Sequence, residues 1–108
     1  MAKNYVQDGK TIPLANGGAT DIDCGDPVVV GKLIAVAITD IPAGQTGDGF
    51  TEGVFLLPKL PADAITVGEQ VYLKDGKIQV AETDAVAAGI AWEDAGASST
   101  VVEVKINA

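Results

Sequence analysis

Hydrophobic positions along this chain come in short runs, which glycine, proline and polar residues interrupt every several positions. Runs this short do not suit ordinary helices of about 11 residues, and their Val and Ile content favours strands. Near the C-terminus, Val102, Val104 and Ile106 alternate with polar residues, as in a half-buried strand. The pattern predicts about eight strands: Thr11 to Ala15, Pro27 to Val30, Leu33 to Thr39, Gly53 to Pro58, Gln70 to Lys74, Lys77 to Ala81, Val86 to Trp92 and Thr100 to Ile106.

The segments between these strands carry turn residues of particular kinds. Asp75-Gly76 supplies the two positive-φ positions of a type I′ hairpin, and Gly31-Lys32 suits a type II′ hairpin. The Gly-rich, polar stretch from Asp40 to Glu52 reads as a long exposed loop. For residues 61–67, either a single helical turn or a short connector is expected.

Short strands at close spacing predict a mainly β fold: a small closed or partly open barrel, or a barrel-like sandwich, with little helix. A chain of 108 residues has the usual size of one domain. We expect a flexible N-terminal arm over residues 1–9 and a single β domain over residues 10–108. Residues 25–28 and 68–71 each place a glycine and an acid before an apolar strand, which indicates either an internal duplication or only shared turn chemistry.

Composition supports a packed domain. Hydrophobic residues make up 47% of the chain and charged residues 20%, which argues against disorder in spite of a formal net charge of -8. Large aromatic residues number only five. The core is therefore expected to consist of small and β-branched side chains.

Two residue types are missing from the chain, and their absence excludes much catalytic machinery. There is no His, and all seven basic residues are Lys. Without imidazole there is no Ser-His or Cys-His dyad, no ordinary general base near neutral pH and no imidazole metal ligand. Without guanidinium there is no bidentate clamp for phosphate. An acidic chain of this kind also repels the DNA backbone, so we expect neither an enzyme nor a nucleic-acid-binding protein.

The single cysteine, Cys24, can form no intrachain disulfide, which is consistent with a reducing compartment. No cationic neighbour in sequence stabilises its thiolate, so it is expected to be inert. The N-terminal residues lack the apolar stretch of a signal peptide, and no window approaches the roughly 20 apolar residues that span a bilayer. We therefore expect a cytosolic protein with no membrane partner.

The carboxylates offer two chemical possibilities, a catalytic pair and a cation site. Asp21 and Asp23 alternate in an extended segment, and Glu93 and Asp94 are adjacent, but a glycosidase would need a long cleft with aromatic platforms. The acidic stretch over residues 21–26 departs from the EF-hand pattern, because it lacks the bidentate Glu and the flanking helices. A solvated face and a turn explain these residues better. We predict no catalytic residue, no metal and no cofactor.

Trp92 ends a predicted strand of small residues, where neighbours approach closely. Tryptophan is enriched in packed cores and in interfaces between subunits. Trp92 is therefore predicted to be either a core residue or an anchor of an oligomer interface.

In order along the chain, several segments together resemble a family of small phage proteins labelled DUF2190, described as capsid cement or decoration proteins. The segments are MAKNYVQDGKTI at residues 1–12, GDPVVV at 25–30, IAVA at 34–37, EGVF at 52–55, GEQVY at 68–72 and AGIA at 88–91. The likeness covers nearly the whole chain.

The resemblance implies a structural virion protein, without enzyme activity, that binds the outer surface of a tailed-phage head and stabilises the capsid. Its implied partners are the major capsid protein and copies of itself, with a trimer favoured over a dimer. It would reside in the host cytoplasm before assembly. The alternative is another small phage structural protein, such as a tail or connector component.

Within this interpretation, the N-terminal arm is the first candidate for contact with the capsid. Tyr5, Val6 and Gln7 are the candidate contact residues, because the arm is able to pair as an added strand with an exposed edge on the shell protein. The alternative is a frayed terminus. The Gly-rich loop around residues 44–49 is the second candidate, with an ordinary solvated loop as its alternative.

Overall fold

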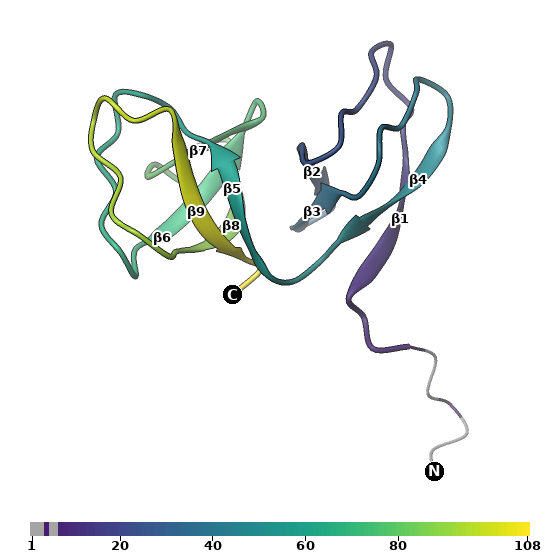
Figure 1. Cartoon of the computed structure of the whole chain (residues 1–108), viewed down its shortest axis with the longest axis horizontal. Coiled ribbons are helices and arrows are strands. Elements are labelled where there is room, and N and C mark those ends of the chain that lie inside the picture. Colours follow the sequence, from purple (N-terminus) through teal and green to yellow (C-terminus); the bar gives the residue numbers. More distant parts are fainter. Residues whose placement is uncertain (1–3, 5–6) are drawn as a thin grey trace.

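The computed structural model describes residue 4 and residues 7–108, and all regular structure in these residues is β (Figure 1). This confirms the predicted mainly β fold with little helix. The nine strands are β1 (Thr11–Ala15), β2 (Pro27–Val30), β3 (Leu33–Ala37), β4 (Thr46–Phe50), β5 (Val54–Pro58), β6 (Gln70–Lys74), β7 (Lys77–Gln79), β8 (Val86–Ala91) and β9 (Val101–Ile106).

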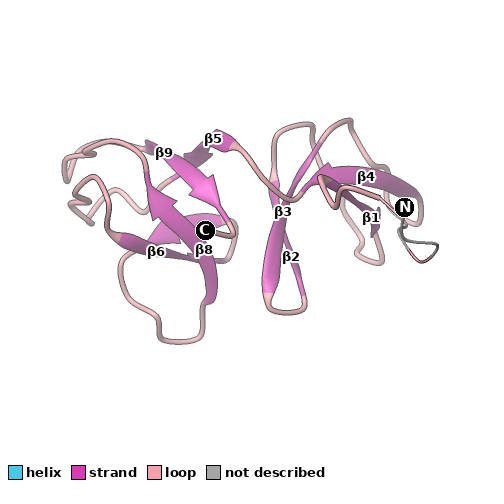
Figure 2. Ribbon diagram, turned by 90° about the horizontal axis from the view of Figure 1, so that it is seen from below, coloured by secondary structure: helices cyan, strands magenta, loops and turns pink. Residues whose placement is uncertain are grey.

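The strands form two antiparallel sheets that lie side by side (Figure 2). The first has the order β1-β4-β3-β2 and the second β5-β9-β8-β6-β7. We call them, with their loops, the first unit and the second unit. Neither sheet closes into a complete barrel, which agrees with the partly open form of the predicted architecture.

The two units repeat one strand arrangement. In the second unit β5, β9, β8 and β6 take the places that β1, β4, β3 and β2 take in the first. The register is the same where the strands begin to pair: Thr11 with Phe50 corresponds to Val54 with Lys105, and Pro27 with Val36 corresponds to Gln70 with Ile90. It differs farther along β6, where a β-bulge between Val71 and Tyr72 shifts the pairing with β8. The structure therefore contains the same β unit twice.

The turns that precede β2 and β6 repeat their hydrogen bonds too. In each, an acidic side chain just before the strand accepts a backbone N–H three residues earlier, and a second carboxylate accepts the next N–H. In the first unit, Asp23 N donates to Asp26 Oδ2 (3.0 Å) and Cys24 N to Asp40 Oδ1 (2.8 Å). In the second unit, Thr66 N donates to Glu69 Oε1 (3.1 Å) and Val67 N to Asp94 Oδ1 (2.8 Å). Shared turn chemistry is thus one part of a repeat that extends through the whole unit.

The second unit contains one strand that the first does not. β7 pairs with the outer edge of β6, and Ile78 forms a parallel bridge with Lys59 just after β5. This bridge brings the two edges of the second sheet together at one point. In the first unit, β2 is itself the edge of the sheet.

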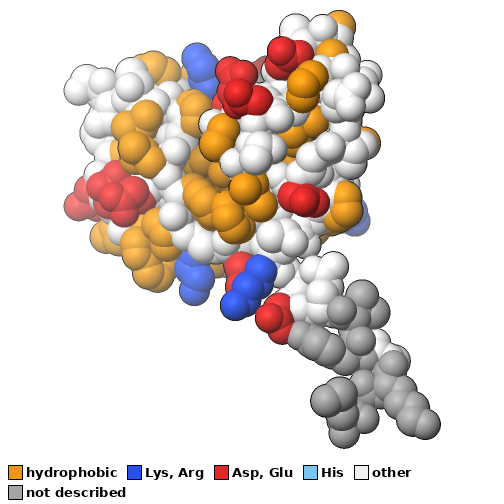
Figure 3. Space-filling model, turned by 45° about the vertical axis from the view of Figure 1, so that its right-hand side comes forward, with side chains coloured by type: hydrophobic (Ala, Val, Ile, Leu, Met, Phe, Trp, Pro, Cys, Tyr) orange, Lys and Arg blue, Asp and Glu red, His pale blue; other side chains and the backbone are white. Residues whose placement is uncertain are grey.

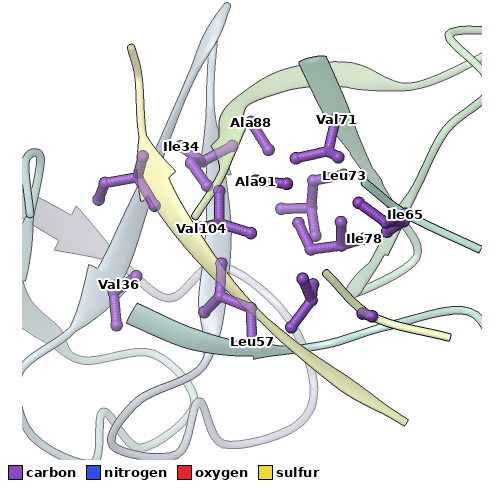
Figure 4. Packing of buried hydrophobic residues seen from close by; sticks show 13 residues of the cluster. Ile34, Val36, Leu57, Ile65, Val71, Leu73, Ile78, Ala88, Ala91 and Val104 are labelled. Atoms are coloured by element: carbon purple, nitrogen blue, oxygen red, sulfur yellow. The ribbon is translucent and has the colours of Figure 1, made fainter. Parts of the chain in front are cut away.

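Inward-facing side chains form two hydrophobic clusters of unequal size. The smaller one holds Leu14, Ala35, Ala37 and Ile41 of the first unit. The larger one fills the second unit and also takes in Ile34 and Val36 from the opposite face of β3 (Figure 4). Since neighbouring side chains of a strand point to opposite faces, β3 is buried on both sides and joins the units.

β4 lies inside the segment that was predicted to be a long exposed loop, so that prediction was wrong. Its glycines are needed for packing and not for a turn. A Cβ on Gly47 would lie 2.6 Å from Ile41 Cγ1, and one on Gly49 would lie 2.6 Å from Leu14 Cδ1. Glycine in a strand often marks such a close approach. β4 therefore pairs with β1 and β3 with almost no side chains on its inner face.

Both predicted hairpins are confirmed. Asp75 and Gly76 have φ values of 51° and 79°, as a type I′ turn requires, and Gly31 has a φ of 60° between β2 and β3. Residues 61–67 form a connector, with Ile65 bridged to Ala95. The predicted strands match the observed ones to within two residues at each end.

Two buried polar side chains occupy equivalent places, Asn16 after β1 and Lys59 after β5. Asn16 Nδ2 donates hydrogen bonds to the carbonyl oxygens of Thr20 and Ile41, both at 2.9 Å. Lys59 Nζ donates to the carbonyl oxygens of Leu60 (2.9 Å), Ser99 (3.1 Å) and Pro61 (3.5 Å). In both units a buried side-chain nitrogen thus holds neighbouring loops together.

Asn107 ties the end of the chain to the first unit. Its side chain accepts from Ile34 N at 3.0 Å and donates to Ile34 O at 2.8 Å and Thr51 O at 2.7 Å. The residue has a φ of 57°, a conformation that asparagine adopts more readily than most residues. The amide thus bonds to the β3 backbone beyond the end of the short β3–β4 pairing.

Replacing Asn107 by glycine should lower the free energy of unfolding by about 1–3 kcal/mol, because three hydrogen bonds are lost while the positive φ is retained. Chemical unfolding followed by circular dichroism measures this change. Ala108→Gly is the control and should leave stability unchanged. Equal stability of Asn107→Gly and the unaltered protein would contradict the proposed role of the amide.

Candidate interaction surface

The outward side of the second sheet carries apolar side chains from neighbouring strands. We call this set the outer apolar face: Val54, Leu56 and Pro58 of β5, Val101 of β9, Ile90 of β8 and Trp92 just after it. Directly paired residues share a face. Leu56 is opposite Glu103 and Pro58 opposite Val101, while Lys105 is opposite both Val54 and Ile90. The inward neighbours Leu57, Val102 and Val104 are fully buried.

Most of this face is open to solvent. Leu56 is 61% exposed, Trp92 50%, Val101 43% and Val54 41%. A strand with one solvated face ordinarily places polar residues outward, whereas β5 is apolar on both faces. Contiguous exposed apolar residues on a soluble protein mark interaction sites.

The first unit supplies an internal comparison for this face. Thr11, Pro13 and Ala15 of β1 stand where Val54, Leu56 and Pro58 stand in β5, and Thr46 stands in the place of Val101. The counterpart of Ile90 is Val36, which the second unit covers in the larger cluster. The outward side chains at these positions are thus small and partly polar in the first unit, whereas those in the second unit are apolar and exposed.

Trp92 belongs to the outer apolar face and not to the core, so the core alternative predicted for it does not hold in this chain. Lys105 Nζ lies 5.5 Å from the centre of its ring, within the range of a cation–π contact. The backbone N–H of Trp92 donates to the backbone oxygen of Glu103 at 2.8 Å. Its role as an interface anchor stays a prediction.

Charges surround apolar side chains on the molecular surface. In the space-filling view, hydrophobic side chains gather over the middle of one face, with acidic groups spread about them and lysines at the edges (Figure 3). A central apolar area with a charged rim is the usual composition of a protein–protein interface. The surface is therefore suited to binding another protein.

Three of the candidate catalytic carboxylates accept backbone hydrogen bonds. Asp21 accepts from Ala43 N, Glu93 from Glu103 N in β9, and Asp94 from Val67 N. Within residues 4 and 7–108, no three His, Cys, Asp or Glu side chains come together as a metal-binding group. Cys24 is exposed, and its Sγ donates to Ile38 O at 3.1 Å. These residues thus shape the loops.

A pocket of about 460 Å³ lies against the β6–β7 hairpin, lined by Leu60, Lys74, Asp75, Lys77 and Gln79. Its lining contains one carboxylate and two amines, with no second carboxylate to form an acid–base pair.

In the part of the chain that the structure describes, no helix has the length and apolarity needed to cross a membrane.

Two of the three predicted capsid-contact residues, Tyr5 and Val6, lie outside the described residues, and the third, Gln7, is exposed. Their contact with the shell stays a prediction. The second predicted contact, around residues 44–49, is largely strand β4 and the turn before it. The outer apolar face was not predicted, although the unbroken apolar run from Val54 to Leu57 is a signal for a strand without a polar face.

Comparison with known proteins gives one match. No curated protein and no solved structure shows significant similarity to this chain. The family model for phage cement proteins matches residues 6–106, which is nearly the full length of the chain and includes all nine strands. The fold carries an exposed apolar face, and the family is that of the phage cement proteins. This chain belongs to the phage cement protein family and has a structural role in the phage capsid.

Proposed function

We propose that the protein binds the outer surface of an assembled phage head and stabilises it by contacting the major capsid protein through the outer apolar face. The observation that carries this proposal is the open position of Leu56, Trp92, Val101 and Val54 on a family member that acts on the capsid. Burial of such side chains against a partner releases about 25 cal/mol for each Å² removed from water. Attachment thus needs surface complementarity and no reaction centre.

The protein acts as a homo-oligomer in this proposal, as a trimer in preference to a dimer. A shell presents local threefold positions at which three copies contact equivalent neighbours. Each subunit then adds its own contacts, so modest individual affinities hold the assembly together. Before assembly, the protein resides in the host cytoplasm.

Leu56→Asp tests the outer apolar face. The carboxylate would have to lose its water on docking, so co-sedimentation with expanded heads that lack the protein should fall at least about 10-fold. Leu56 is 61% exposed, so the fold should remain intact, as circular dichroism would check.

Pro13→Asp, at the equivalent outward position of the first unit, is the matched control and should leave co-sedimentation unchanged. If Leu56→Asp pelleted with heads as well as the unaltered protein does, the outer apolar face would not be the contact. Electron microscopy of virions tests the location: density on the head surface supports the proposal, and density at the tail would overturn it.

A further inference from the structure

The open edge of β2 differs from the corresponding edge in the second unit. There, β7 covers β6 through the pairs Tyr72–Gln79, Leu73–Ile78 and Lys74–Lys77. Ile78 is completely buried in the larger cluster, and its carbonyl accepts from Leu60 N at 2.9 Å. β7 therefore fills a gap between β6 and the segment that follows β5, with one isoleucine directed into the core.

In the first unit this gap has no strand from the described residues. Val29 stands where Tyr72 stands in the second unit, and Val30 where Leu73 stands. Val30 and Leu33 close the two-residue hairpin turn, so alternation directs the N–H and C=O of Val29 away from β3. Gly17 stands where Leu60 stands, on the other side of the gap. We call the place between β2 and Gly17, which β7 fills in the second unit, the slot of the first unit.

The apolar residues beside this slot are incompletely covered. Ile22, Val28 and Val30 are only partly buried, although they pack on the smaller cluster. Their counterparts Ile65, Val71 and Leu73 are buried in the second unit. An unpaired edge with the sequence Pro-Val-Val-Val is a template for another strand, and proteins generally keep such edges covered.

We propose that the N-terminal arm of a second copy of this chain occupies the slot as an added strand. Its residues Tyr5-Val6-Gln7 match Lys77-Ile78-Gln79 of β7, with a β-branched apolar residue followed by glutamine. Val6 then pairs with Val30 and points into the smaller cluster, as Ile78 does beside Leu73. Gln7 pairs with Val29 on the outward side.

The geometry requires that the arm come from a different copy. In the second unit, β7 runs parallel to the chain at Lys59, with Ile78 beside Lys59. An arm bound in the same direction in the first unit would run parallel to β1, with Val6 beside Asn16. The chain beyond Val6 would then lead away from Thr11, which lies five strand residues, about 17 Å, in the opposite direction. Residues 7–10 are too few to reverse direction and cover that distance. The arm of a neighbouring copy has no such constraint.

This contact rests on the proposed self-association of the protein. The partner of the arm is then a second copy of the chain and not the shell. The contact between copies is tested on the isolated protein, without phage heads. A negative result would therefore leave the proposal about the outer apolar face unaffected. Strand addition of this kind supplies main-chain hydrogen bonds, with a single side chain as the specific anchor.

Cysteine pairs test both the partner and the register. In a Cys24→Ser background, Val6→Cys with Val30→Cys should form a disulfide between chains on mild oxidation. The control pair is Val6→Cys with Val28→Cys, which is displaced by two residues along the same strand. Cross-linked dimers and larger species on a non-reducing gel should be at least about 5-fold more abundant for the first pair, because cysteines two residues out of register are too far apart.

A second measurement uses the chain without cysteine pairs. Val6→Asp places a carboxylate in the slot and should reduce the mass of the protein in solution by sedimentation, without loss of the β fold. Equal cross-linking of the two cysteine pairs, a disulfide confined within one chain, or an unchanged mass for Val6→Asp would overturn the inference. Deletion of residues 2–9 that abolished head binding without altering the mass would also overturn it, and would assign the arm to the shell.

Discussion

Gly89→Ala is expected to lower the free energy of unfolding by about 3 kcal/mol or more, with a fall in the unfolding temperature of about 10 °C or more. Gly89 has a φ of 145°, which side chains rarely adopt. A Cβ at this position would lie 2.0 Å from Lys105 O and 3.0 Å from Ile106 Cα. Backbone atoms of a central strand have no room to move aside, so β8 and β9 would have to separate.

Gly96→Ala is the control for this prediction. No atom lies within 4 Å of a Cβ built on Gly96, and its φ lies outside the left-handed region. Its stability should stay within about 0.5 kcal/mol of that of the unaltered protein. Chemical unfolding followed by circular dichroism compares the two variants. A Gly89→Ala protein as stable as Gly96→Ala would show that β8 and β9 do not approach as closely as described.

Lys59→Met is also expected to lower the free energy of unfolding, by about 2 kcal/mol. Methionine fills a similar volume but leaves the carbonyls of Leu60, Pro61 and Ser99 without the Nζ donor. Removing the desolvated ammonium recovers part of this cost, since a buried charge is itself unfavourable. The lost hydrogen bonds outweigh that gain, because three carbonyls lose their N–H donors at once.

Lys32→Met is the matched control, because Lys32 is exposed in the hairpin turn. Its replacement should change the free energy of unfolding by less than about 0.5 kcal/mol. The comparison separates loss of a charge from loss of the buried bonds. Equal stability of the two variants in chemical unfolding would refute the role assigned to Lys59.

The parts of the fold that were predictable from the sequence are those set by local chemistry. Asp75-Gly76 specifies a hairpin because both residues must take positive φ, and the alternation from Val102 to Ile106 specifies a half-buried strand. β4 was missed because Gly47 and Gly49 also occur in loops. What makes them strand residues is the presence of Ile41 and Leu14, which approach them from elsewhere in the chain.

The sequence allowed us to predict that the protein binds a partner, but not which surface does so. Absence of imidazole and guanidinium, together with the family resemblance, pointed to a binding protein. Which face binds depends on tertiary contacts that no local pattern reports. Val36 and Ile90 occupy equivalent positions in similar strands, yet one is covered by the second unit and the other lies on an open face. Trp92 illustrates the same limit, since the sequence allowed both core and interface.

The unequal sizes of the two hydrophobic clusters have a consequence for how the molecule comes apart. Four buried side chains hold the interior of the first unit, whereas the cluster of the second unit is larger and also includes Ile34 and Val36. Local opening starts where fewest apolar contacts must break. The hairpin edge at β2 should therefore loosen first, while β3 remains attached to its neighbour. An isolated subunit thus opens from its first unit, before the second unit loses any of its core.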